Sequence, residues 1–183
     1  MSSLSKNALQ ILKERYLLKD SDGTIIETPH QLFKRVATCV ASCEGEKKEI
    51  FKEKFYDILR KLYFLPNSPT LMNAGIQNGQ LSACFVLPIR DRLEDIFDTL
   101  KHTALIHQSG GGTGFNFSNL RPKDDFVSSK SGTSSGPVAF MNIYDAATEY
   151  VKQGGKRRGA NMGILNVNHP DIEAFITSKS HKN

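Results

Sequence analysis

The sequence is short of cysteine and has no long apolar run. Its three cysteines are an odd number among 183 residues, which argues against the disulfide framework of a secreted domain and fits a reducing compartment. No apolar stretch approaches the roughly 20 residues that a membrane-spanning helix needs, and residues 1–6 lack the apolar segment of a secretion signal. We therefore expect a cytoplasmic protein.

The composition is that of a folded, soluble protein. Hydrophobic residues make up 39% and charged residues 23% of the chain, values that distinguish it from disordered sequences. The length suits one domain or one and a half. The net charge of +5 favours anionic partners only weakly, and because the lysines are scattered, a solvated surface explains them.

The first third of the chain carries the apolar spacing of helices. We expect a helix at residues 7–19, a second that starts with Thr28 as its cap and Pro29 in its first turn, and a third at residues 48–64. The predicted inward stripes of the second and third helices are Leu32, Phe33, Val36, Ala37, Val40, and Phe51, Phe55, Ile58, Leu59, Leu62. Cys39 and Cys43 lie four residues apart on the second helix, but a metal site would need two further ligands. We interpret both as packing residues.

The composition changes at residues 65–75, where two prolines and several small polar residues predict an ordered, extended loop. Cys84 then opens a short apolar run that Pro88 ends, and residues 85–87 are predicted to form a buried strand. The thiol can be interpreted in two ways. It fills a gap in the core, or it is a catalytic group held on the rigid backbone at a strand end. This stretch alone favours packing.

A helix is predicted to begin at Asp91, because Asp91 and Glu94 have the spacing of a capping box. Its predicted inward stripe is Leu93, Ile96, Phe97, Leu100, Ala104 and Leu105. We interpret His102 and His107 as surface or packing residues rather than ligands. The glycine-rich residues 109–114 follow and allow close approach of a ligand to the backbone, but they match neither a dinucleotide fingerprint nor a P-loop.

The remaining sequence alternates between strand and helix patterns. We expect a strand at residues 115–117, a mobile loop or linker at 128–136, and a helix from Pro137 that residues 153–155 terminate. Three cations at residues 156–158 form either a solvated turn or an anion grip, and a strand at 162–166 leads to a short helix that ends at Ile176. The alternation predicts parallel strands with helical crossovers, and about three strands are too few to close a barrel.

Six stretches taken together, in this order and spacing, resemble the catalytic chain of ribonucleotide reductase, which makes deoxyribonucleotides for DNA replication. They are residues 65–75, 81–88, 91–96, 109–114, 135–141 and 153–165. The resemblance extends from about residue 6 to about residue 178, and the wording Gly-Ala-Asn-Met-Gly near its end is most similar to the class II, adenosylcobalamin-dependent branch.

The resemblance implies an α/β fold, with a helical N-terminal region (1–64) followed by the first portion of a ten-stranded α/β barrel (65–183), incomplete here. It implies reduction of ribonucleotides, as diphosphates, by radical chemistry with a redox dithiol. In the family a cysteine inside the barrel becomes a thiyl radical that takes the 3′-hydrogen, and in class II the Co–C bond of adenosylcobalamin generates it. The implied partners are a ribonucleotide substrate, a deoxynucleotide effector, a thioredoxin-like reductant and a complementing C-terminal chain or a homodimer, with no membrane and no nucleic acid.

The resemblance also implies roles for individual residues. Cys84 takes the position of one member of the redox pair, and no metal site is implied. The positions where the family contacts its substrate are Ser68, Ala83, Cys84 and Gly112. Those where it binds the effector are Asp91, Leu93, Gln108 and Arg121. Those of the specificity loop, which carries the effector's message to the active site, are Gln153, Lys156, Arg157 and Arg158.

In the family, the radical cysteine and the second redox cysteine lie downstream of the last residue here. We therefore expect this chain alone to be unable to complete the reaction, and we expect a complementing chain because an unfinished barrel exposes strand edges. Two other hypotheses remain. One is a non-catalytic nucleotide-binding module that kept the effector site. The other is a nucleic-acid binder that uses the basic loop, whose binding would depend strongly on salt.

Overall fold

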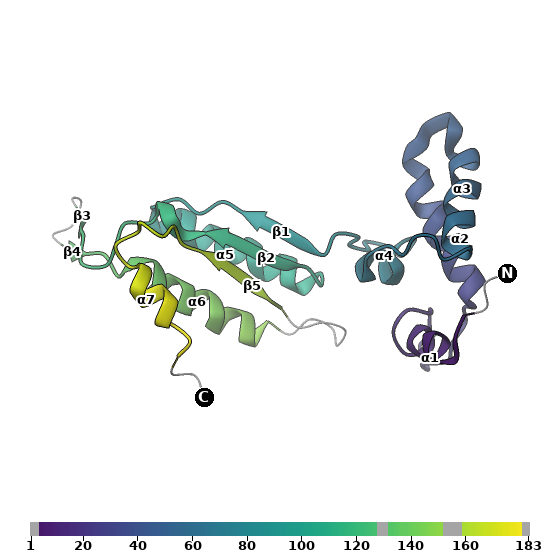
Figure 1. Cartoon of the computed structure of the whole chain (residues 1–183), viewed down its shortest axis with the longest axis horizontal. Coiled ribbons are helices and arrows are strands. Elements are labelled where there is room, and N and C mark those ends of the chain that lie inside the picture. The colour runs from purple at the N-terminus through teal and green to yellow at the C-terminus, as the bar shows by residue number, and fades with distance from the viewer. Residues whose placement is uncertain (1–3, 128–131, 152–158, 181–183) are drawn as a thin grey trace. The chain divides into compact units, whose positions relative to one another are not determined.

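The computed structural model describes residues 4–127, 132–151 and 159–180 (Figure 1). The chain divides into two compact units, residues 1–83 and 84–183. We expected the division after residue 64, but the segment that follows packs into the first unit, where Leu71 and Ala74 are buried in the core. Among the described residues, none of the helices combines the length and apolar character needed to cross a bilayer.

The first unit is helical, as predicted. Its elements are α1 (Lys6–Arg15), α2 (Pro29–Ala41), the 3₁₀ helix η1 (Ser42–Lys47), α3 (Lys48–Arg60) and α4 (Ser68–Asn73). Helices α1 and α3 end four residues earlier than predicted. Thr28 caps α2 as expected, and together with Gln31 it forms a complete capping box.

Helix α4 contradicts the extended loop that we predicted there. The side chain of Asn67 accepts a hydrogen bond from the backbone N–H of Thr70 at 2.9 Å, so Asn67 is the N-cap. Pro69 lies in the first turn, where its missing N–H costs nothing. The residues that suggested a loop are therefore the start signal of a short helix.

The core of the first unit surrounds α2, and one buried ion pair adjoins it. The apolar stripe predicted for α2 is buried except for Val40. Of the stripe predicted for α3, only Leu59 is buried. Arg35 donates from Nε to Glu27 at 2.7 Å and from Nη1 to the carbonyl oxygen of Ala74 at 2.5 Å. The side chains of Arg35 and Glu27 are 13% and 5% exposed. This arginine therefore joins the segment before α2 to the end of α4.

Substituting Arg35→Met should lower the free energy of unfolding by about 3–5 kcal/mol, because it leaves the Glu27 carboxylate buried without its partner. Urea denaturation monitored by circular dichroism measures this loss. Lys61→Met removes one partner of an exposed ion pair with Asp57 and is the matched control, which should unfold like the parent. A loss in the control as large as in Arg35→Met would contradict the special role of the buried pair.

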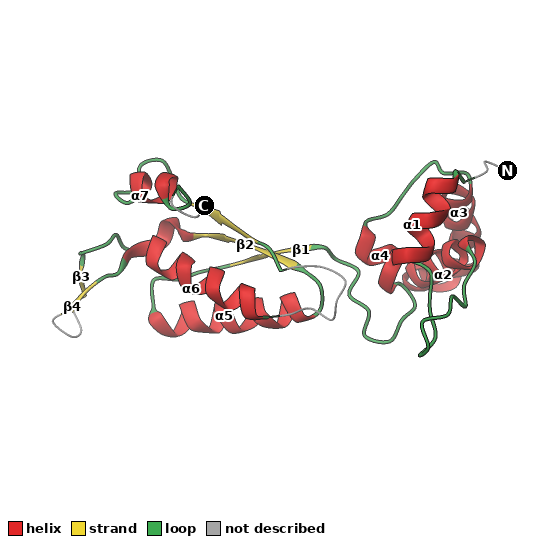
Figure 2. Cartoon of the chain, turned by 90° about the horizontal axis from the view of Figure 1, so that it is seen from below, coloured by secondary structure: helices red, strands yellow, loops and turns green. Residues whose placement is uncertain are grey.

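The second unit contains a three-stranded parallel sheet in the order β1-β2-β5, with helical crossovers, as predicted. Strands β1 (Cys84–Leu87), β2 (Gly112–Asn116) and β5 (Asn161–Ile164) are connected by α5 (Leu93–Gln108) and α6 (Gly136–Tyr150). Figure 2 shows both helices on the same side of the sheet. The remaining elements are η2 (Phe117–Asn119), β3 (Phe126–Val127), β4 (Gly132–Thr133) and α7 (Ile172–Thr177).

In the second unit, our predictions of the start of β2, of a mobile loop at residues 132–133 and of the cap of α5 were wrong. Strand β2 begins at Gly112, inside the glycine-rich run, rather than at residue 115. Residues 132–133, assigned to a mobile loop, pair with β3 as β4, while residues 128–131 lie outside the described residues. Asp91 does not cap α5, whose N-cap position is Arg92 without a side-chain cap bond, because the Asp91 carboxylate binds Arg121 instead.

Helix α5 is rotated relative to our prediction. Three residues predicted to face the core, Leu93, Phe97 and Leu105, are 63%, 46% and 54% exposed. The buried positions are Ile96 and a polar series four residues apart, Thr99, Thr103 and His107. Thr99 donates from Oγ1 to the carbonyl oxygen of Pro88 at 2.9 Å, which ties the helix to the end of β1. Hydrogen bonds satisfied within the core therefore allow this helix to bury threonines.

An aromatic cluster fills the space between the sheet and α6. The rings of Phe115 and Tyr144 meet edge to face with centroids 4.9 Å apart, and Phe117 packs beside both. The Tyr144 hydroxyl donates to the carbonyl oxygen of Ile96 at 2.6 Å, and burial raises the pKa of Tyr144 to about 12. Tyr144 therefore joins α6 to α5 through the core.

Candidate functional site

Helices α5 and α6 cover one face of the sheet, and they leave the other face open (Figure 2). Side chains alternate along a strand, so Thr113 and Phe115 of β2 point toward the helices and are buried. The positions on the other face of the sheet include Cys84, Val86, Gly112, Gly114 and Met162. Val86 is 87% exposed. Our prediction of a strand at residues 85–87 is confirmed by β1. Our prediction that this strand is buried is wrong for its open face, where Val86 lies.

Cys84 and Gly112 are direct neighbours in the sheet. They pair across the parallel strands β1 and β2, each at the first residue of its strand. Cys84 is exposed and has a free thiol. Within this chain Cys84 therefore fills no gap in a core, although its local sequence favoured that interpretation. The structure thus brings together two of the predicted substrate residues, with the thiol accessible beside a backbone that has no side chain.

Close packing at Gly111 holds the start of β2 in place. A Cβ atom at this position would lie 2.7 Å from both Ile106 of α5 and Phe85 of β1. A side chain at residue 111 would therefore force the side chain of Ile106 or Phe85, or the strand itself, to move.

Ser68 and Ala83, the other predicted substrate residues, belong to the first unit. The Ser68 hydroxyl lies at the start of α4, with its Oγ 3.0 Å from the hydroxyl of Tyr16. From the same helix, Asn73 donates to the carbonyl oxygen of Gln80 at 2.8 Å and so holds the segment that leads to Ala83. Sequence analysis did not identify Tyr16, since a tyrosine on a helical stripe gives no separate signal of a polar partner.

Two predicted effector residues, Asp91 and Arg121, form an ion pair. Arg121 donates from Nε to Asp91 Oδ2 at 2.6 Å, and the two side chains are 32% and 33% exposed. A carboxylate can accept hydrogen bonds from ribose hydroxyls, and a guanidinium can bind phosphate oxygens. Partly exposed pairs contribute about 0–1 kcal/mol, so a polar ligand can rearrange this one at small cost.

The other two effector positions lie at opposite ends of α5. Leu93 is its first residue, two positions from Asp91, and Gln108 is its last. The rise of 1.5 Å per residue places these ends about 22 Å apart. The structure therefore gathers Asp91, Leu93 and Arg121 at one end of the helix and leaves Gln108 at the other. The specificity-loop positions Gln153, Lys156, Arg157 and Arg158 lie outside the described residues.

His107, which we interpreted as a surface or packing residue, is a fully buried polar group. Its side chain has no exposed surface, and its Nε2 lies 2.9 Å from Thr113 Oγ1 on β2. Burial lowers the pKa of His107, and the Ala160 backbone partly opposes that shift. The spacing Thr99-x₃-Thr103-x₃-His107 was the signal, because polar residues four apart share one helix face.

The lowered pKa of His107 predicts a loss of stability in acid. Below about pH 6.5 the unfolded chain takes up a proton that the folded ring resists, so the free energy of unfolding falls until the pH passes the lowered pKa of the folded state. His107→Gln should reduce this loss between about pH 7.5 and 5.5, measured by denaturation at each pH. His102→Gln, at an exposed position of the same helix, should keep the parent's dependence. Equal pH dependence in the parent and His107→Gln would contradict the prediction.

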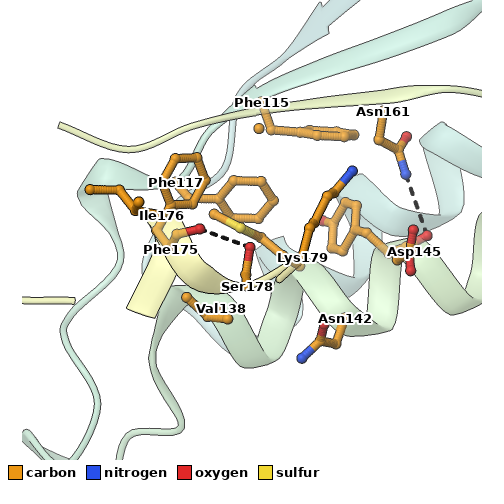
Figure 3. Close-up of a pocket in the computed structure, with 13 residues that line it drawn as sticks. Phe115, Phe117, Val138, Asn142, Asp145, Asn161, Phe175, Ile176, Ser178 and Lys179 are labelled. Carbon is orange, nitrogen blue, oxygen red and sulfur yellow. Dashed lines mark hydrogen bonds between the residues drawn. The ribbon is translucent and has the colours of Figure 1, made fainter. Parts of the chain in front are cut away.

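A pocket of about 320 Å³ opens on the helix-covered side of the sheet (Figure 3). Phe115 and Phe117 line it from the sheet side, and Asn142 and Lys179 contribute polar groups. None of the predicted substrate or effector residues lines this pocket. Within the part of the chain that the structure describes, no group of three or more histidine, cysteine or acidic side chains is placed to hold a metal ion.

Comparison with known proteins matches both units. Residues 82–183 match the family described as "Ribonucleotide reductase, barrel domain", and residues 2–79 match "Ribonucleotide reductase, all-alpha domain". The chain is 48% identical to a vitamin B12-dependent ribonucleoside-diphosphate reductase of Thermoplasma acidophilum, with 98% of this chain and 31% of the relative covered. A protein of the same name from Mycobacterium tuberculosis is 50% identical, with coverages of 97% and 26%.

A more distant relative is a ribonucleoside-diphosphate reductase large chain of Schizosaccharomyces pombe. It is 38% identical, and the match covers 94% of this chain and 21% of the relative. The chain thus spans less than a third of the length of each of these relatives.

Proposed function

Because the chain belongs to the ribonucleotide reductase family, we propose that it supplies one thiol and part of the nucleotide-binding surface for reduction of ribonucleoside diphosphates. The observation that carries this proposal is Cys84, a free and exposed thiol paired in register with Gly112. We propose that the helical unit and the three parallel strands act as one part of a larger catalytic assembly, because the relatives are more than three times as long as the matched region.

In the proposed reaction Cys84 is one of two thiols. Both are oxidised to a disulfide, and the two electrons and protons that they release replace the ribose 2′-hydroxyl by hydrogen and release water. A thiol that must reach a substrate carbon and then a second sulfur needs a fixed backbone within a few ångströms of both. A strand end provides this position, and Gly112 beside it allows the sugar to approach the main chain.

Two of the relatives are named for vitamin B12, and we propose adenosylcobalamin as the cofactor of the complete enzyme. Bound there, it would generate the protein radical. We assign no cobalamin-binding residue to this chain. A thioredoxin-like reductant and a cytoplasmic location complete the proposal and rest on the sequence alone.

We propose a homodimer for the effector site. Within one chain, Asp91 and Gln108 are separated by the length of α5. A single nucleotide can therefore contact Asp91 of one chain and Gln108 only when Gln108 comes from a second copy whose α5 lies beside the first. The exposed apolar residues Leu93, Phe97 and Leu105 on α5 provide such a surface. Phe97→Glu should shift sedimentation toward monomer, whereas Ile26→Glu, an exposed apolar site in the other unit, should not. A monomeric parent would refute the dimer.

Reduction requires the part of the enzyme that this chain lacks. Adding a chain that spans the remainder of the reductase should restore formation of deoxyribonucleotide, measured by chromatography of the products. Cys84→Ser should then lower the rate by at least about a thousandfold, since the reducing thiol is lost. Cys43→Ser, which removes an exposed thiol of the helical unit, is the matched control and should stay active.

A non-catalytic nucleotide-binding module is the alternative. It predicts that deoxynucleotide binds but that no reduction appears on complementation. A complemented parent that binds effector and remains inactive would favour this alternative over the reductase.

Effector binding should depend on Asp91 and not on Cys84. Asp91→Ala removes an acceptor for the ribose and leaves Arg121 without its partner, so deoxynucleotide affinity should fall roughly ten- to a hundredfold, the equivalent of about 1.5–3 kcal/mol. Isothermal titration calorimetry measures the loss. Asp98→Ala, at an exposed position on α5, and Cys84→Ser should bind like the parent. Equal losses in Asp91→Ala and Cys84→Ser would refute separate sites.

A further inference from the structure

A continuous chain of side-chain hydrogen bonds connects α5, β2, β5 and α6. His107 Nε2 lies 2.9 Å from Thr113 Oγ1, and Thr113 Oγ1 lies 2.7 Å from Asn161 Oδ1. Asn161 Nδ2 lies 2.7 Å from Thr148 Oγ1, which in turn lies 2.8 Å from the carbonyl oxygen of Tyr144. Each of the four elements therefore contributes one side chain to the same network.

The direction of every bond follows from the carbonyl end. The Tyr144 carbonyl can only accept, so the Thr148 hydroxyl donates to it and accepts from the Asn161 amide nitrogen. Asn161 Oδ1 then faces Thr113 and accepts its only hydroxyl proton. Thr113 Oγ1 must therefore accept from His107, so the proton of the neutral imidazole lies on Nε2.

The other ring nitrogen then carries a lone pair. His107 Nδ1 is buried and makes no hydrogen bond of normal geometry among the described residues. The Ala160 carbonyl, which partly opposes the lowering of the His107 pKa, accepts from the backbone N–H of Thr113 instead. A Cβ atom on Gly159 would lie 2.8 Å from Nδ1 and 2.9 Å from the Thr148 methyl group. The main chain before β5 therefore packs directly on the imidazole, and any side chain at residue 159 would force the two apart.

This hydrogen-bond network reaches the main chain next to the exposed Cys84 thiol. Thr113 follows Gly112, and Gly112 pairs with Cys84 across the sheet. The backbone N–H of Thr113 also donates to the Ala160 carbonyl at 3.0 Å. The start of β2 is thus held by side-chain hydrogen bonds on the helix-covered face and by one backbone bond to the segment before β5.

We infer that His107 is a positioning residue for the reducing site, which fixes the main chain at Gly112 by donating from Nε2 to Thr113. The inference rests on the proposed function for its effect on substrate, but the hydrogen bond itself requires no ligand. Satisfied buried networks of this kind hold elements rigidly, and loss of a donor leaves the remaining acceptor unmet. His107 touches no reacting atom in this account and acts through β2.

The substitutions His107→Gln and His107→Met separate hydrogen-bond donation from packing. Glutamine and methionine are similar in size, but only glutamine can donate a hydrogen bond from the position of Nε2. In the chain as it exists, His107→Met should speed amide hydrogen exchange at Gly112–Gly114 by roughly tenfold, the equivalent of about 1.4 kcal/mol. His107→Gln should exchange within about threefold of the parent. Nitrogen-15 spectra of the parent should place the neutral ring's proton on Nε2.

A proton on Nδ1, or equal exchange in the Gln and Met variants, would overturn the inference. In the complemented reductase His107→Met should raise KM for ribonucleotide more than it lowers kcat, and His107→Gln should restore KM. An active parent with unchanged KM in His107→Met would overturn the positioning role. An inactive parent would instead count against the proposed function, and the exchange data would still decide the hydrogen bond.

Discussion

The arrangement of the second unit depends on the register of a parallel β-ladder. Parallel strands place equivalent ends at the same edge, so pairing Cys84 with Gly112 puts a thiol beside bare backbone at the start of both strands. A slip of one residue would turn Cys84 toward the helices and Phe85 toward the open face. Close packing at Gly111 and the bond from His107 to Thr113 resist that slip from two directions. The chemistry proposed for Cys84 therefore rests on contacts made on the opposite side of the sheet.

Much of this architecture could be predicted from the sequence. Apolar periodicity located α2, α5 and α6, and the alternation of patterns predicted the parallel strands and their crossovers. The resemblance of ordered motifs predicted the family, which local chemistry could not do. Cys84 shows why, since its local sequence suggested a core residue, whereas the ordered motifs on both sides of it implied a redox role.

The failures have particular physical causes. Residues that begin a short helix and residues that form an ordered loop are the same types, so Asn67 and Pro69 were ambiguous until the cap bond was seen. On α5 the apolar count suggested that Leu93 and Phe97 face inward, but hydrogen bonds allow Thr99, Thr103 and His107 to occupy the core. The Asp91 carboxylate could either cap α5 or form an ion pair. The local sequence predicts only the cap, because the ion-pair partner Arg121 is 30 residues away.

In the effector role that we propose for them, Asp91 and Arg121 would have to exchange their mutual contact for contacts with the nucleotide. Without nucleotide the carboxylate and the guanidinium already satisfy one another, so a ribose hydroxyl or phosphate that binds there replaces a contact rather than adding one. The affinity would then equal the gain from the new contacts minus the cost of opening the pair, which is about 0–1 kcal/mol for a partly exposed pair. This opening cost is the same for every nucleotide, so it lowers the affinity for all of them equally. The differences between nucleotides must then arise from other contacts.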